Sequence, residues 1–125
     1  MRLLLDSQVF YWLLHLPERV GPKARKNLAD RANELWYSAL TPWELAIKRA
    51  KGALRFDDAA LLRGIDAFRL RELPISTRHG LAAAALPAHH RDPFDRLLVS
   101  QALVEKLPIL STDPQISRYP IETLW

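Results

Sequence analysis

The sequence predicts an α/β fold of three layers: a central, mostly parallel sheet of about five short strands, flanked by helices. The main observation is an alternation of short apolar runs, typical of buried strands, with longer segments of helical periodicity. The length supports the same conclusion, because 125 residues form one domain with a sizeable core. No repeat or low-complexity linker divides the chain, so we expect one domain over residues 1–125.

The N-terminal part of the chain begins with a strand. The run RLLL (2–5) is short and apolar, as expected for a buried strand, and SQVFYWLLHL (7–16) has the periodicity of a helix. Pro17 ends this helix. A second helix is expected over KARKNLADRANEL (23–35), and a second strand over LWYSAL (35–40).

The middle of the chain adds two helices and a strand. PWELAIKRAKG (42–52) predicts a helix that Gly52 closes in the left-handed conformation. DDAALLRGIDAFRL (57–70) predicts another helix, weakened by Gly64 in its interior. The third strand is expected at RELPI (71–75).

The C-terminal part continues the alternation. Helices are expected at STRHGLAAAAL (76–86) and DPFDRLLVSQALVEKL (92–107). PILST (108–112) predicts a fourth strand, DPQISRY (113–119) a helical turn, and IETLW (121–125) a last strand. Ligands of such sheets bind beyond the carboxyl ends of the strands, so we expect the chemistry of the protein there.

The composition excludes several function classes. The chain has no cysteine, which rules out disulfides, zinc–thiolate sites and thiol catalysis. The N-terminal apolar run stops at Asp6, and no apolar stretch reaches the roughly 18 residues of a membrane span. We therefore expect a cytoplasmic protein without signal peptide or membrane insertion. Its net charge of +4 is compatible with an anionic partner such as nucleic acid.

Four acids stand where the carboxyl ends of strands are expected. Asp6 directly follows the first strand, and Glu44 lies in the first turn of the helix after the second. Asp95 lies in the first turn of its own helix, and Asp113 follows PILST. Carboxylates are the hard oxygen ligands that Mg²⁺ and Mn²⁺ prefer. Gathered without a cation they would repel one another, so the pattern is compatible with a divalent metal site.

The same acids also fit the start signals of helices. TPWE places Thr41 at the N-cap and Glu44 three residues later, as in a capping box, and DPFD does the same with Asp92 and Asp95. The fourth acid also precedes a proline, as an N-cap would. Asp6 fits this interpretation least well, because a lone carboxylate at the end of a buried strand is costly, although it too could cap the following helix. Spacing alone leaves both interpretations open.

Other chemistry is sparse in the sequence. There is no glycine-rich phosphate loop, since the chain has only four glycines. The histidines show no ligand spacing with one another, and the pair HH is interpreted as part of a loop. These residues are His15, His79, His89 and His90.

Three long segments and the overall length resemble the PIN-domain ribonucleases, in particular the toxin component of VapBC-type toxin–antitoxin pairs. The segments are LLLDSQVFYWLL, TPWELAIKRAKGAL and LAAAALPAHHRDPFDRLLVSQALVEKLPILSTD. Their order and spacing together are specific and cover nearly the whole chain. The resemblance implies a PIN-like domain and favours the metal interpretation of the acids.

The resemblance also implies roles for individual residues. Those expected to be catalytic and to bind the metal are Asp6, Glu44, Asp95 and Asp113. Ser7 and Ser111 match supporting hydroxyl positions, and Asp92 is expected beside the site, as a helix cap. Gln8 replaces the histidine or asparagine common in the family, which bears on substrate choice.

The implied function is Mg²⁺- or Mn²⁺-dependent cleavage of RNA phosphodiesters by a water molecule that the metal activates. The chain would then be an endoribonuclease, the toxin of a type II toxin–antitoxin pair. Outside the four acids the net charge rises from +4 to +8, which suits RNA held over an acidic pocket. The expected RNA-binding residues are Lys48, Arg49, Arg91 and Arg96, with Arg25, Lys26 and Lys51 as further candidates for a basic rim.

The resemblance further implies an antitoxin partner, in a toxin–antitoxin hetero-oligomer, or else a homodimer of the chain. We expect the first two helices to contribute apolar residues to such a surface, although the same residues could form the core. These residues are Val9, Phe10, Trp12, Leu13, Leu14 and Leu28.

Two other functions remain as alternatives. One is a PIN-like binding module without catalysis, and the presence of all four acids counts against it. The other is a phosphoryl-transfer enzyme with Asp6 as nucleophile. Against it, DSQVF lacks the second aspartate of such a motif, and PILST lacks a matching lysine.

Overall fold

The computed structural model describes residues 1–125 and contains a five-stranded sheet in the order β3-β2-β1-β4-β5. All strand pairs are parallel. The strands are β1 (Arg2–Leu5), β2 (Glu34–Ser38), β3 (Arg71–Leu73), β4 (Ile109–Leu110) and β5 (Thr123–Leu124). β1 lies at the centre, where Leu4 is level with Trp36 on β2 and with Ile109 on β4.

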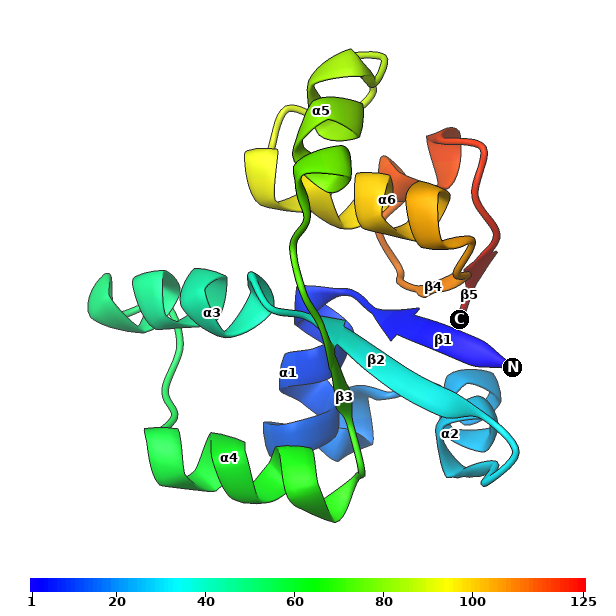
Figure 1. Cartoon of the computed structure of the whole chain (residues 1–125). Coiled ribbons are helices and arrows are strands. Elements are labelled where there is room, and N and C mark those ends of the chain that lie inside the picture. Colours follow the sequence, from blue (N-terminus) through cyan, green and yellow to red (C-terminus); the bar gives the residue numbers. More distant parts are fainter.

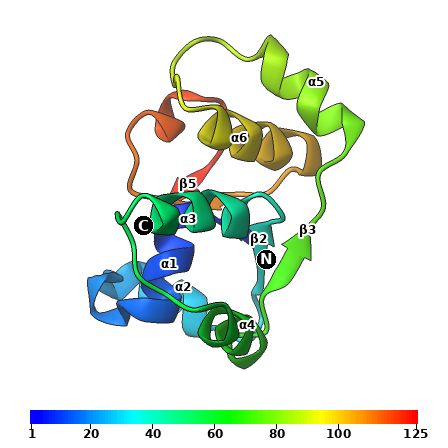
Figure 2. The same ribbon diagram turned by 90° about the vertical axis from the view of Figure 1, so that its left-hand side faces the viewer.

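Helices cover both faces of the sheet. They are α1 (Ser7–His15), α2 (Pro22–Ala29), α3 (Thr41–Ala50), α4 (Asp58–Ala67), α5 (Thr77–Ala85) and α6 (Pro93–Glu105), with short 3₁₀ helices at Pro17–Arg19 and Ile116–Arg118. In Figure 1, α5 and α6 lie above the sheet and α1, α2 and α4 below it, and Figure 2 shows the same layers after a quarter turn. The predicted three-layer α/β architecture is confirmed. None of the helices has both the length and the apolar character of a membrane span.

Two apolar cores hold the layers together, and β1 belongs to both. Leu3 and Leu5 belong to the core that includes residues of α1 to α4, whereas Leu4 belongs to the core that includes residues of α6. All three leucines are fully buried, which explains why β1 is a continuous apolar run. In the first core, Phe10 of α1 packs against Tyr37 of β2 with ring centroids 5.1 Å apart. A residue that directly follows β1 is therefore attached to a strand that is buried on both faces.

The predicted second helix is too long. Predicted over 23–35, it ends at Ala29, and β2 begins at Glu34. Between them the Asp30 side chain accepts a hydrogen bond from the Ala32 amide at 2.9 Å, which closes a turn. β2 also ends two residues before its predicted end at position 40.

Glycine occurs at positions 52 and 64 for two different structural reasons. Gly52 follows α3 with φ of 78°, the left-handed conformation predicted for it. Gly64 lies in α4 against α1, and a Cβ at this position would come within 2.6 Å of Leu14 Cδ2. The missing side chain lets the two helices pack closely, which explains a residue of poor helix propensity inside α4.

The apolar residues assigned to a partner surface belong largely to the core. Val9, Phe10 and Leu13 are buried within the domain, so the prediction is wrong for them. The other three are half-buried and pack against the same core: Trp12, Leu14 and Leu28. Periodicity could not separate the alternatives, because a core face and an interface are both apolar stripes at helical spacing.

Candidate functional site

The candidate site lies at the carboxyl edge of the sheet, beside β1. The chain runs from β1 to β2 on one side, whereas β4 pairs with β1 on the other side. Ligands of open parallel sheets bind at such a switch point. A pocket of about 700 Å³ opens there, and it is lined by all four acids predicted from the sequence: Asp6, Glu44, Asp95 and Asp113. Ser7, Gln8 and Asp92 also line this pocket.

Asp6 is both a helix cap and a member of the acid cluster. It is 4% exposed, and its Oδ1 accepts a hydrogen bond from the Val9 amide at 2.7 Å, which caps α1. Burial raises the pKa of Asp6 to about 6, although hydrogen bonds from Ser111 and Val9 act to lower it. The negative charges of Asp113 and Glu44 add to the rise. Capping and membership of the cluster are therefore compatible for this acid.

Glu44 does not form the predicted capping box. Leu40 is the N-cap of α3, no side chain makes a cap hydrogen bond, and Thr41 is already helical. The Glu44 side chain is buried, and its Oε2 accepts from Ser7 Oγ at 3.1 Å and from Lys48 Nζ at 3.0 Å. The capping interpretation of TPWE is wrong, because contacts with α1 and with the next turn of α3 hold this carboxylate at the pocket.

The cap predicted at Asp92 is confirmed, but Asp95 does not complete the predicted capping box, because the Asp92 amide donates to His90 Nδ1 instead. Asp92 Oδ1 accepts the amides of Phe94 at 2.8 Å and Asp95 at 3.4 Å and so caps α6. Burial raises the pKa of Asp95 to about 7, and repulsion from Asp92 and Glu44 contributes, whereas His90 acts in the opposite direction. A carboxyl group with a pKa near neutrality in a pocket is typical of functional sites.

The two supporting serines each contact an acid of the cluster. Ser7 donates to Glu44 and thereby connects α1 with α3. Ser111 accepts the Asp113 amide at 3.0 Å, and its side chain hydrogen-bonds Asp6. These contacts keep acids from the ends of β1, β2 and β4 at fixed positions relative to one another.

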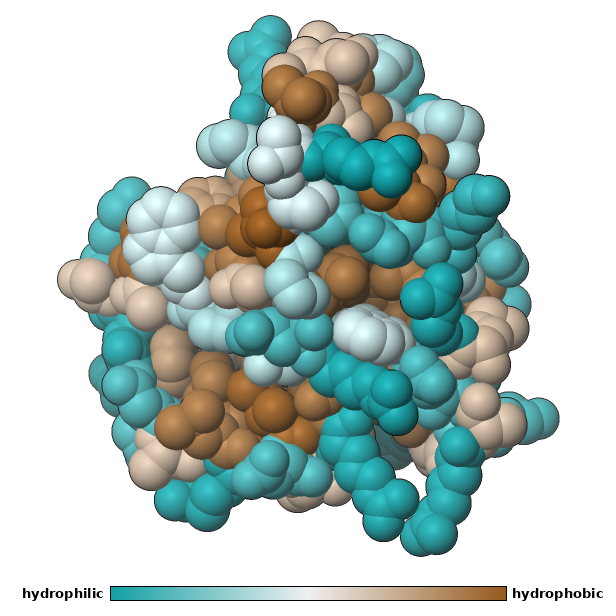
Figure 3. Space-filling model, in the orientation of Figure 1, coloured by the Kyte–Doolittle hydropathy of each residue, from teal (hydrophilic) through white to brown (hydrophobic).

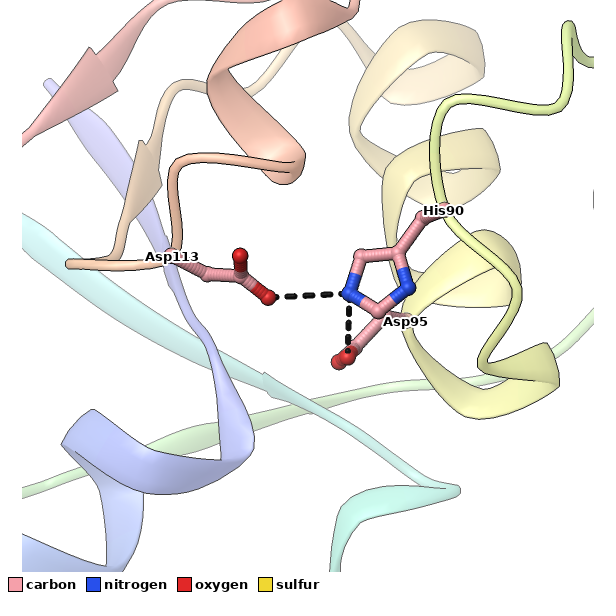
Figure 4. A group of neighbouring side chains, drawn as sticks. All are labelled: His90, Asp95 and Asp113. Atoms are coloured by element: carbon pink, nitrogen blue, oxygen red, sulfur yellow. Dashed lines mark hydrogen bonds and ion pairs between the residues drawn. The ribbon is translucent and has the colours of Figure 1, made fainter.

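His90 is a residue of the site that sequence reasoning missed. Its Nε2 lies 2.9 Å from Asp113 Oδ2 and 3.0 Å from Asp95 Oδ2 (Figure 4). Ligand-type atoms of the three residues lie within 4.8 Å of one another. The backbone of the HH pair lies in a loop, as expected. The sequence did not predict this role of the side chain, because Asp113 is distant in sequence. A local signal that could have indicated it is a histidine two residues before a capping aspartate.

Basic side chains surround the acidic pocket. Lys48 lines it and pairs with Glu44. Burial alone would lower the pKa of Lys48, but its hydrogen bond and charge pairing with Glu44 outweigh this effect and raise it. Arg19 and Arg55, which the sequence did not single out, are exposed and also line the pocket. Arg91 is exposed as well. The pocket thus combines a carboxylate cluster with cations at its margin.

Two of the expected RNA-binding arginines are engaged within the protein. Arg49 pairs with Asp58 at 2.7 Å and lies over the Phe56 ring, 4.3 Å from its centroid. Arg96 donates hydrogen bonds to four backbone carbonyls of the segment before α6, those of Ala83, Leu86, Pro87 and His90. We therefore assign Arg49 and Arg96 to the stability of the domain and leave them out of the proposed RNA-binding set.

The donor atoms of the pocket fit a hard divalent cation. Four carboxylates from separate elements face one space, and mutual repulsion contributes to the raised pKa values of Asp6 and Asp95. A bound cation would remove this repulsion. Carboxylate oxygens are preferred by Mg²⁺ and Mn²⁺, so either ion suits this set of residues.

The raised pKa values predict that stability without divalent ions falls as the pH rises. Asp6 and Asp95 hold protons more tightly in the folded chain than in the unfolded chain, whose carboxyl pKa is about 4. Between about pH 4 and pH 7 the folded state therefore binds more protons, and stability decreases with pH. We expect this loss, measured as thermal midpoints in chelator, to be smaller in Asp95→Asn. An equal loss in this variant would contradict the raised pKa.

Comparisons with known proteins agree with this fold. The family model of the PIN domain matches residues 3–122. The structure of VapBC2 from Rickettsia felis, bound to a promoter DNA fragment, matches with a TM-score of 0.75 and 16% identity over 99% of this chain and 98% of that one. DNA-bound VapBC from Salmonella typhimurium matches with a TM-score of 0.73 and 16% identity, over 99% of this chain and 97% of that one. VapBC-5 from Mycobacterium tuberculosis matches with a TM-score of 0.64 and 16% identity, over 98% of this chain and 97% of that one.

These structural matches, at 16% identity, establish the shared fold. No curated protein sequence matches the chain. The family model, however, extends over nearly the whole domain, from β1 to the residue before β5, and includes all four acids of the pocket. The chain therefore belongs to the PIN domain family.

Proposed function

We propose that this protein is a divalent-metal-dependent endoribonuclease and the toxin of a type II toxin–antitoxin pair. The observation that carries the proposal is the convergence of four acids from separate elements on one pocket at the switch point of the sheet. Helix capping alone does not require such a cluster, since Ser76 caps α5 with an uncharged side chain. A cation that binds a phosphodiester accounts for the cluster and for the basic margin together.

In this proposal the metal ligands are Asp6, Glu44, Asp95 and Asp113. A bound Mg²⁺ or Mn²⁺ supplies Lewis acidity to the phosphoryl oxygens and lowers the pKa of a water molecule. The chain's own residues orient the ligands: the Val9 amide holds Asp6, and Ser7 and Lys48 hold Glu44. The Lys48 side chain is 47% exposed, so its ammonium group also has room to contact a phosphate oxygen.

Digestion of total RNA by the purified protein tests the proposed activity. We expect cleavage with Mg²⁺ or Mn²⁺ and none in chelator, and mapping of the cut ends would define the target sequence. Absence of cleavage with either ion would contradict the nuclease and favour a PIN-like binding module. A trapped phosphate on Asp6 would instead indicate phosphoryl transfer.

RNA binding by an inactive variant should weaken steeply as the salt concentration rises. The chain outside the four acids carries a net charge of +8, and Arg19, Arg55 and Arg91 are exposed. For single-stranded RNA the salt slope is about −0.7 per phosphate contact, so three contacts predict a loss of roughly twentyfold between 50 and 200 mM salt. Fluorescence anisotropy with Asp113→Asn measures this loss, and a flat response would contradict the basic margin.

An antitoxin is the proposed protein partner, because three of the solved structures that match are of VapBC toxin–antitoxin systems. Exposed apolar residues lie on α4 and α5: Leu62 is 61% exposed and Leu81 is 69% exposed. Figure 3 shows apolar patches at the lower left, by α4, and at the top, by α5. Co-expression with a candidate antitoxin and size-exclusion chromatography would test this surface. Loss of the complex in Leu62→Asp or Leu81→Asp would identify the patch that binds; a complex unaffected by both changes would exclude these patches.

A further inference from the structure

The His90 ring is held on both of its nitrogen sides. Its Nδ1 accepts a hydrogen bond from the Asp92 amide at 3.1 Å, and its Nε2 lies between Asp95 Oδ2 and Asp113 Oδ2. The backbone of His90 is held too, because its amide donates to Tyr119 Oη at 2.9 Å and its carbonyl accepts from Arg96. The side chain is 14% exposed. The ring therefore has little freedom to choose other partners.

The amide at Asp92 determines which ring nitrogen carries the proton. A backbone N–H only donates, so Nδ1 must present its lone pair to it. In a neutral imidazole the proton then resides on Nε2, which becomes a donor to the two carboxylates. A protonated nitrogen has no lone pair for a metal. For Nε2 to become a ligand, the proton would have to move to Nδ1 and face another N–H group.

His79 shows the same arrangement away from the pocket. Its Nδ1 accepts the Ser76 amide at 3.0 Å, and its Nε2 lies 2.9 Å from Glu105 Oε1. A helix-cap amide and a carboxylate thus hold a histidine in the Nε2–H form at two places in this chain. At α5 the arrangement is purely structural, so His79 is a matched internal control for His90.

We propose that His90 is a positioning residue of the metal site and not one of its ligands. Its Nε2–H donates to Asp95 and Asp113 and holds the two carboxylates, one from α6 and one from the segment after β4, at a fixed separation. The Asp113 carboxylate is held on its other oxygen by the Gln115 amide at 2.8 Å. This inference rests on the proposed metal-dependent function. By its composition alone, the group of His90, Asp95 and Asp113 suggests three metal ligands. In this proposal His90 is a hydrogen-bond donor, and the two aspartates accept from it.

Two substitutions separate the two sides of the ring. His90→Gln places an amide NH₂ near the position of Nε2 and keeps the donor to the carboxylates, but it loses the acceptor for the Asp92 amide. His90→Asn keeps an acceptor near the position of Nδ1 and loses the donor. We expect His90→Asn to lower Mg²⁺ affinity, measured by calorimetry without RNA, by about 10- to 100-fold. We expect His90→Gln to bind Mg²⁺ close to the wild-type level.

Wild-type affinity in His90→Asn would overturn the proposal, and so would equal losses in both variants, because the ring itself would then be required. Thermal melts in chelator show whether each variant is folded. If the wild-type protein binds neither Mg²⁺ nor Mn²⁺, the proposed metal function itself is wrong. If the wild type binds Mg²⁺ and His90→Asn binds it equally, the metal site remains and only the role of His90 is refuted.

The protonation state of the ring gives a second test that needs no activity. Long-range ¹H–¹⁵N spectra of the imidazole rings distinguish Nε2–H from Nδ1–H, and the signal lost in His90→Gln identifies His90. We expect Nε2–H in chelator and again at saturating Mg²⁺, with His79 unchanged throughout. Nδ1–H in chelator, or a switch to Nδ1–H on addition of Mg²⁺, would overturn the proposal, because the switch is what ligation through Nε2 requires.

Discussion

Replacement of any one of the four clustered acids by its amide is expected to reduce Mg²⁺-dependent RNA cleavage by at least roughly 100-fold. Loss of a residue that merely orients a ligand already costs 10- to 100-fold in metal affinity or activity, and loss of a ligand should cost more. An amide keeps the shape of the side chain and removes the negative charge that a hard dication requires. The variants are Asp6→Asn, Glu44→Gln, Asp95→Asn and Asp113→Asn. Cleavage of a labelled RNA with Mg²⁺ measures the effect.

The same variants should remain folded, which separates catalysis from helix capping. Asparagine is as good an N-cap as aspartate, so Asp6→Asn keeps the acceptor for the Val9 amide. Burial raises the pKa of the Asp95 carboxyl group to about 7, which means that its charge is unfavourable in the folded chain. Asp95→Asn removes this charge, so the melting temperature of the variant in chelator should match or exceed that of the wild type. Variants that melt early but still cut RNA would show that the acids are structural and that the nuclease proposal is wrong.

Asp92→Asn is the matched control for Asp95→Asn. Both change an aspartate at the start of α6, at the N-cap in one case and in the first turn in the other, and both residues line the pocket. Asp92 already has a structural task, the cap bonds to Phe94 and Asp95, which an asparagine Oδ1 can accept. We expect this variant to keep most of its activity. If it is as inactive as Asp95→Asn, both aspartates belong to the metal site.

Local rules predicted the parts of the site that depend on local contacts. The caps at Asp6 and Asp92 follow from side chains that bond amides two or three residues ahead, and a sequence displays that spacing directly. The capping box at Glu44 failed because Ser7 competes for the same carboxylate from another helix. Spacing contains no information about such a competitor.

The short strands at the end of the sheet show the same limit. β4 and β5 have two residues each, and their pairing with β1 and with each other defines them. The apolar character of PILST indicates a buried strand, but the length of the strand depends on partners that are distant in sequence. The convergence of Asp6 and Asp113 on one pocket likewise depends on the β1–β4 pairing, which neither the alternation of elements nor their periodicity could locate.

Arg96→Met is expected to lower the free energy of unfolding by about 2–4 kcal/mol. The guanidinium group donates to four carbonyls, with N···O distances from 2.9 Å to Ala83 up to 3.3 Å to His90. Methionine keeps part of the apolar stem and donates nothing, so all four carbonyls lose the guanidinium donor. The carbonyls of Ala83 and Pro87 keep other donors, the amides of Leu86 and His89. Chemical denaturation in chelator measures the change. A loss below about 0.5 kcal/mol would show that water replaces the guanidinium group without cost.

Arg91→Met is the control that separates this structural role from RNA binding. Arg91 is exposed in the same segment, so its loss should change the free energy of unfolding by less than about 0.5 kcal/mol. It should weaken RNA binding and reduce the salt slope by the contribution of one phosphate contact, about 0.7. Under conditions where Arg96→Met is still folded, its salt slope should equal that of the wild type, because its guanidinium group already holds the chain. The opposite result, with a reduced slope in Arg96→Met and an unchanged one in Arg91→Met, would return Arg96 to the RNA-binding surface predicted from the sequence.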